Sequence, residues 1–169
     1  MWNYTFVVPN ISLLFVFLLY YFSQPHIPIS KNRAFIRLLL IEIIIIFFDV
    51  LSSYALDRYD SFPVFFHLAC NIAFFIAFFL RSLFFFYFTY VILVPKSQRR
   101  LVNLLLANSV FLISVLITLA NFFTPTLFVL NQNGYQRYRL YNILYANAFF
   151  YLGISLLTLA INRNKLRKK

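Results

Sequence analysis

The chain has 169 residues, of which 63% are hydrophobic and 11% charged, and its fifteen Lys and Arg against four Asp and Glu give a net charge of +11. An average soluble domain is about half apolar and a quarter charged, so this composition excludes an ordinary globular enzyme and predicts a membrane protein. One cysteine and two glycines exclude a disulfide framework, a thiolate metal cluster and a collagen-like chain.

Five apolar runs are long enough to cross the roughly 30 Å hydrocarbon core of a bilayer as helices. They lack the period-two alternation of barrel strands, so we expect an all-α, polytopic helical membrane bundle with five transmembrane helices. The expected spans cover residues 6–22, 34–56, 65–94, 101–123 and 143–161. They predict one transmembrane domain over residues 1–161, followed by a basic cytoplasmic tail at 162–169.

The basic residues lie mainly on one side of these runs. Segments 23–33, 95–100 and 162–169 carry ten Lys or Arg together, whereas the loops on the opposite side carry three. Because cytoplasmic loops are enriched in Lys and Arg, we expect the amino terminus outside the cell and the carboxyl terminus in the cytoplasm. The first run is expected to be a retained helix, because no Lys or Arg precedes Lys31 as a signal peptide would require.

The link between the fourth and fifth runs contains a hairpin signal. Two β-prone stretches, 127–130 and 135–140, flank the sequence Asn-Gln-Asn-Gly at 131–134, and Asn-Gly is favoured in tight turns between strands. We expect a short extracellular hairpin or an aromatic cap at the membrane interface. Its candidates for contact with an external signal are Tyr135, Arg137, Tyr138 and Arg139.

Three ionisable residues lie at membrane depth in the expected spans: Glu42, Asp49 and Arg81. Arg37 lies at the start of the second span. Each of the three costs about 2.5–3.5 kcal/mol to insert, so each requires an explanation. Glu42 and Asp49 are seven residues apart and share a helix face, and Arg81 can reach either. The three form an intramembrane polar latch under three open interpretations: a structural ion pair, a cluster that responds to a signal or carries an ion, or a group facing a water-filled gap.

Polar and small residues recur at helical spacing in the last two runs. We expect these faces to lie inside the bundle and to form interhelical hydrogen bonds, the alternative being a ligand or lipid cleft. They comprise Asn103, Ala107, Ser114, Thr118 and Asn121 in the fourth run, and Asn147, Tyr151, Ser155, Thr158 and Asn162 in the fifth.

Motifs for catalysis or metal binding are missing from the sequence. His26 and His67 have no further ligands at metal-binding spacing, and there is no Gly-rich phosphate loop or Ser-His-Asp set. We therefore expect a non-enzymatic protein without metal or cofactor. The basic tail is typical of an anchor at anionic lipid headgroups, so we expect the lipid bilayer as a partner and no nucleic acid.

Two stretches resemble a known family. Residues 48–56, Phe-Asp-Val-Leu-Ser-Ser-Tyr-Ala-Leu, and residues 133–141, Asn-Gly-Tyr-Gln-Arg-Tyr-Arg-Leu-Tyr, resemble the amino-terminal multi-pass membrane sensor region of clostridial-type GGDEF diguanylate cyclases. The resemblance implies an input module in a bacterial cytoplasmic membrane. It also implies that Asp49, which lies on the shared motif, is a stronger candidate than Glu42.

The chain departs from that family in three ways. It has five expected spans rather than seven or eight, no output-domain signature, and Arg-Tyr-Arg at 137–139 in place of Arg-Gly-Pro. These departures imply a truncated input module, or one that works in trans with a separate cytoplasmic output protein or as a homo-oligomer.

The leading hypothesis is a sensor in which a signal shifts helix packing, with Asp49 and Arg81 as the internal latch. A small holin-like or ion-conducting membrane oligomer is a competing interpretation. A third is a non-functional fragment of a longer receptor.

Overall fold

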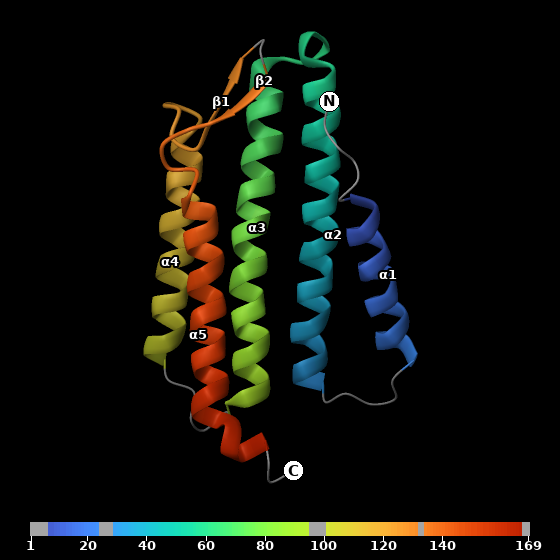
Figure 1. The fold of residues 1–169 in the computed structure, drawn as a ribbon, viewed down its shortest axis with the longest axis vertical. Helices are drawn as coiled ribbons and strands as arrows, with labels where there is room; N and C mark the ends of the chain where they lie inside the picture. The colour runs from blue at the N-terminus through green and yellow to red at the C-terminus, as the bar shows by residue number, and fades with distance from the viewer. Residues whose placement is uncertain (1–6, 24–28, 95–100, 132–133, 167–169) are drawn as a thin grey trace.

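The computed structural model describes residues 7–23, 29–94, 101–131 and 134–166, most of which are helical. Long helices run side by side along the longest axis of the molecule, and a two-stranded sheet lies at one end (Figure 1). The helices are α1 (Val7–Ser23), α2 (Ile29–Asp57), α3 (Val64–Leu93), α4 (Leu101–Ala120) and α5 (Ile143–Leu166), with a short 3₁₀ helix η2 (Tyr59–Ser61) between α2 and α3.

Three of these helices are long and apolar enough to cross a membrane: α3, α4, and the part of α5 from Ile143 to Asn162. This result rests on helix length and composition within the described part of the chain. An α-helix also occupies the two runs before them, as α1 and α2. The sequence-based expectation of a helical membrane bundle is thus supported for the half of the chain that begins with α3.

Three helix ends differ clearly from the sequence-based expectation. Helix α2 begins at Ile29 rather than at residue 34. Helix α4 ends at Ala120 rather than at residue 123, because the next residue, Asn121, uses its side chain to bind the backbone of the following loop. Helix α5 continues to Leu166, so the segment expected to be a tail begins as helix. Helix formation requires only compatible backbone angles, and basic side chains are good helix formers.

Helix α3 is the centre of the bundle and contacts α2, α4 and α5, while α1 contacts α2. The buried side chains of α3 include Phe75, Phe79 and Phe86. Large apolar side chains cover the outside instead, as with Leu106 on α4, which is 60% exposed, and Phe149 on α5, which is 68% exposed. Such apolar outer faces are favourable against lipid and would be costly in water.

The two-stranded sheet is an antiparallel hairpin of β1 (Phe128–Asn131) and β2 (Gly134–Arg137). Phe128 lies opposite Arg137 and Leu130 lies opposite Tyr135. The hairpin predicted from the Asn-Gly signal is therefore confirmed. It lies at the same end of the molecule as the corner between α2 and α3 (Figure 1).

Candidate functional site

Asn121 holds the hairpin to the end of α4. Its Oδ1 atom accepts hydrogen bonds from the backbone N–H groups of Thr126, Leu127 and Phe128 at 2.9, 2.8 and 3.2 Å. Its Nδ2 atom donates to the carbonyl oxygen of Phe128 at 3.2 Å. One buried amide side chain thus replaces the hydrogen-bond partners that a tight loop cannot supply from its own backbone.

Stacked aromatic rings join the hairpin to α3. Phe75 of α3 stacks on Phe128 of β1 with ring centroids 5.4 Å apart, and Phe128 stacks on Tyr135 of β2 at the same distance. Tyr141, just before α5, meets the edges of both Phe75 and Tyr135. Burial, reinforced by the neighbouring hydroxyl of Tyr141, raises the pKa of Tyr135 above its ordinary value.

A cavity of about 320 Å³ lies between the hairpin, α2 and α3, and we call it the hairpin cavity. Helix α2 contributes Asp49 and Ser52, and the hairpin contributes Tyr135 and Arg137. The rest of its lining is Asn71, Phe74 and Phe75 of α3 and Tyr141. The structure therefore brings Asp49 together with two of the four predicted signal-contact residues, although they are far apart in the sequence.

The carboxyl group of Asp49 is half-buried in this cavity. Ser52 and Ser53 donate to its backbone oxygen at 3.0 and 2.7 Å, so they leave its side chain free. Among the residues that the structure describes, no basic side chain pairs with Asp49. The hairpin cavity thus contains an acid without a basic partner in the described part of the bundle.

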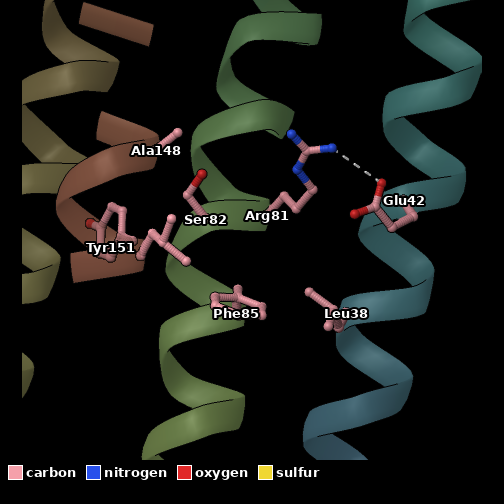
Figure 2. Close-up of a pocket in the computed structure, with 8 residues that line it drawn as sticks. Leu38, Glu42, Arg81, Ser82, Phe85, Ala148 and Tyr151 are labelled. Atoms are coloured by element: carbon pink, nitrogen blue, oxygen red, sulfur yellow. Dashed lines mark ion pairs between the residues drawn. The ribbon is translucent and has the colours of Figure 1, made fainter. Parts of the chain in front are cut away.

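Arg81 pairs with Glu42 rather than with Asp49. The Nη1 atom of Arg81 lies 3.5 Å from Oε2 of Glu42, and its guanidinium carbon lies 4.4 Å from the ring centroid of Phe78. Figure 2 shows Arg81 extending from α3 toward Glu42 on α2. The expected ion pair between Asp49 and Arg81 is therefore wrong, because the acid that pairs with Arg81 is Glu42.

The pairing follows from how far each residue lies from the corner between the two antiparallel helices. Glu42 lies fifteen residues before the end of α2 and Arg81 lies seventeen residues after the start of α3. At about 1.5 Å per residue these depths differ by roughly 3 Å. Asp49, only eight residues before the end of α2, matches Asn71, which lies seven residues into α3.

The Glu42–Arg81 pair borders a second cavity of about 280 Å³, which we call the mid-bundle cavity. Ser82 and Phe85 of α3 line it, together with Ala148 and Tyr151 of α5 (Figure 2). The side chains of Arg81 and Glu42 are 34% and 32% exposed, so the pair is only partly enclosed by protein. Both cavities adjoin the interface between α2 and α3.

Hydrogen bonds between α4 and α5 confirm the predicted polar stripes as bundle-facing. Asn147 donates from Nδ2 to Oγ of Ser114 at 2.9 Å, and the Tyr151 hydroxyl donates to the carbonyl oxygen of Ala107 at 2.6 Å. The buried members of the two stripes are Ala107, Ser114, Thr118, Asn121, Asn147, Tyr151, Ser155 and Asn162. Asn103 is an exception, because its side chain is exposed on α4.

His67 fixes the corner between α2 and α3. Its ring is fully buried and stacks on the ring of Tyr59. The distance from its Nε2 atom to the carbonyl oxygen of Tyr59 is 3.2 Å. Asn71, one turn further along, donates to the His67 carbonyl oxygen at 2.9 Å. This corner sets the relative depth of α2 and α3, and hence the pairing described above.

The other predicted contact residues lie outside the hairpin cavity. Tyr138 and Arg139 are exposed, and the Arg139 guanidinium lies 5.8 Å from the Tyr138 ring centroid. His26 and the end of the expected basic tail fall outside the described residues. Within the described chain, no three His, Cys, Asp or Glu side chains are close enough to share a metal ion.

Sequence reasoning missed two residues of this site. Asn121 was assigned to interhelical bonding, although an Asn directly after an apolar helical run, with Pro125 close behind, is a recognised signal for a helix end and a turn. Asn71 was not singled out, although its distance from the corner is within one residue of that of Asp49. Both signals are present in the sequence.

Comparisons of the chain with protein-family models, with curated proteins and with solved structures find no match. The resemblance to the membrane sensor region of GGDEF proteins therefore stays a prediction.

Proposed function

We propose that this chain is a non-enzymatic, multi-pass membrane protein that acts as the input module of a bacterial signalling receptor. In this proposal all five helices cross the cytoplasmic membrane, with the hairpin outside. The basic segments 23–33, 95–100 and 162–169 support this orientation, because they adjoin helix ends opposite the hairpin. Cytoplasmic loops are the ones enriched in Lys and Arg.

The observation that carries the proposal is the composition of the hairpin cavity. It joins the exposed hairpin to α2 and α3, and its acid has no partner within the described protein. A ligand bound there would contact all three elements at once. Such a ligand shifts helix packing to the extent that it binds one packing more tightly than the other.

The Glu42–Arg81 ion pair supplies the inner part of the proposed mechanism. It joins the same two helices as the hairpin cavity, about two turns of α2 away from Asp49. A shift of α2 along α3 changes the distance between the two charges. The pair therefore favours one relative position of α2 and α3, and a signal in the hairpin cavity works against that preference.

The test is a distance measurement across the end of the bundle opposite the hairpin. Cys70 is the single cysteine, so Cys70→Ser gives a background without native thiols. Cysteines introduced at Ile36 of α2 and Ile161 of α5, which are both exposed, then carry the spin labels. Electron paramagnetic resonance on the full chain in lipid nanodiscs then gives the distance distribution. We expect Asp49→Asn to change that distribution and the exposed Arg139→Gln control to leave it unchanged.

Superimposable distributions for the parent, the Asp49→Asn variant and the control, all equally folded, would refute coupling between the hairpin cavity and the far end. The competing permeation class has its own readout in proteoliposomes. Ion flux that scales with protein and is lost in Glu42→Gln would replace the input module by an ion-conducting protein.

A further inference from the structure

The hairpin cavity contains an acid and a base that do not pair with each other. Asp49 enters it from α2 and Arg137 enters it from β2. In the described parts of the chain neither side chain forms an ion pair. The guanidinium carbon of Arg137 lies 4.6 Å from the ring centroid of Tyr141. Two opposite charges thus border one space and leave it open.

The rest of the lining is apolar and aromatic with a few polar groups. Phe74, Phe75 and Tyr141 supply ring surface, and Ser52 and Asn71 supply hydroxyl and amide groups. Pockets that bind small molecules measure about 300–1,000 Å³ and have this kind of lining. At about 320 Å³ the hairpin cavity is at the small end of that range.

We propose that the hairpin cavity binds a small zwitterion of the amino-acid class that has an apolar side chain. The ligand's ammonium group would bind the carboxylate of Asp49, its carboxylate would bind the guanidinium of Arg137, and its side chain would lie against the rings of α3. This inference rests on the proposed input-module function and names the chemical class of its signal.

Charge balance favours a zwitterion over a ligand with one charge. A simple cation would neutralise Asp49 but would bring no group for Arg137, and a simple anion would leave Asp49 desolvated and unpaired. A guanidinium fits a carboxylate with two parallel hydrogen bonds, which makes Arg137 the natural carboxylate contact. Because Arg137 is exposed and Asp49 is half-buried, the ligand's carboxylate would face the entrance and its ammonium group the interior.

The test uses three probes that share the phenylethyl group: phenylalanine, phenethylamine, which lacks the carboxylate, and 3-phenylpropanoate, which lacks the ammonium group. The full chain in lipid nanodiscs binds tritiated phenylalanine, and the other two compete. A hydrogen bond to a charged group changes affinity by about tenfold to a hundredfold. We therefore expect phenylalanine to bind at least about tenfold more tightly than either analogue, and leucine to compete as a second apolar amino acid.

Two variants assign the contacts. Asp49→Asn should reduce phenylalanine affinity to that of 3-phenylpropanoate, and Arg137→Gln should reduce it to that of phenethylamine. The matched controls are Asp60→Asn and Arg139→Gln, which change exposed residues outside the cavity near the same end of the molecule. Both controls should retain the parent affinity, and elution as a single sharp peak shows that each variant is folded.

Three results would overturn the proposal: no saturable binding of phenylalanine or leucine, equal affinity for phenylalanine and phenethylamine, or unchanged binding in both cavity variants. The spin-label distances separate this failure from failure of the input-module function. If neither amino acid binds but Asp49→Asn changes the α2–α5 distance, the zwitterion assignment fails and the input module stands. If phenylalanine binds without changing that distance, the site stands and the input role fails.

Discussion

Replacing Asn121 with Ala should release the hairpin from the bundle while leaving the helices in place. In the native chain one Asn121 oxygen accepts three backbone N–H groups, from residues 126, 127 and 128. Alanine removes that acceptor and adds no new group. The hairpin then has to expose these N–H groups to solvent or leave them without partners.

The magnitude follows from which of the three N–H groups can reach water. Leu127 and Phe128 are 0% and 1% exposed, so two of the three groups cannot be solvated unless the hairpin moves. A buried polar group without a partner costs about 1–3 kcal/mol. We therefore expect Asn121→Ala to destabilise the hairpin by about 3 kcal/mol, and Asn121→Asp, which retains the acceptor, to cost less.

Amide hydrogen exchange by mass spectrometry, on the full chain in nanodiscs, measures this change directly. A loss of about 3 kcal/mol corresponds to roughly a hundredfold faster exchange for the amides of 126–128. Asn108→Ala is the matched control, because Asn108 also lies on α4 but bonds to Tyr87 of α3. The reasoning is refuted if hairpin exchange in Asn121→Ala equals that of the parent, or if Asn108→Ala accelerates it equally.

Three further predictions concern the bundle and the hairpin. Glu42→Arg and Arg81→Glu should each reduce the yield of folded protein in detergent, since an unpaired charge in a membrane costs about 2.5–3.5 kcal/mol. The double exchange should restore the yield. No loss of yield in either single variant would remove the pair from the mechanism. Tyr151→Phe should lower the free energy of unfolding by about 1 kcal/mol, because it removes the hydrogen bond to the α4 backbone, and the thermal midpoint should fall. Tyr145→Phe, which changes a half-exposed ring, should leave the midpoint almost unchanged. Because burial raises the pKa of Tyr135, the unfolded chain ionises this residue at about pH 10 while the folded chain keeps it protonated. Its contribution to stability is thus present below that pH and lost above it, so near-ultraviolet circular dichroism should show a smaller alkaline loss of structure in Tyr135→Phe than in the parent.

The helices and the hairpin could be predicted because their signals are local. Apolar runs of about 20 residues indicate helices that suit a bilayer, and α3, α4 and α5 have the required length and composition. The sequence Asn-Gln-Asn-Gly between two β-prone stretches predicts a hairpin, and the structure pairs the two strands with Asn131 opposite Gly134. Neither inference requires knowledge of how the helices are arranged.

The partner of Arg81 was predicted wrongly because the pairing depends on two helices at once. Counting along α2 shows that Glu42 and Asp49 share a face, but it says nothing about their depth relative to α3. That depth is fixed by the corner at η2, where buried His67 bonds to Tyr59. Counting outward from the corner along both helices gives the Glu42–Arg81 pair. Relative depth, rather than shared face, is therefore the better guide for antiparallel neighbours joined by a short link.

The distribution of polar contacts also indicates which part of the bundle moves under the proposed function. Helices α4 and α5 are joined by buried hydrogen bonds from Asn147 and Tyr151, and Tyr87 joins α3 to α4. Breaking these contacts would leave buried polar groups without partners. The interface of α2 with α3 instead contains one partly exposed ion pair and adjoins both cavities. Because α2 also packs extensively on α3, we expect a ligand in the hairpin cavity to slide α2 along α3 rather than to separate the two helices, and labels on α2 and α5 report that displacement.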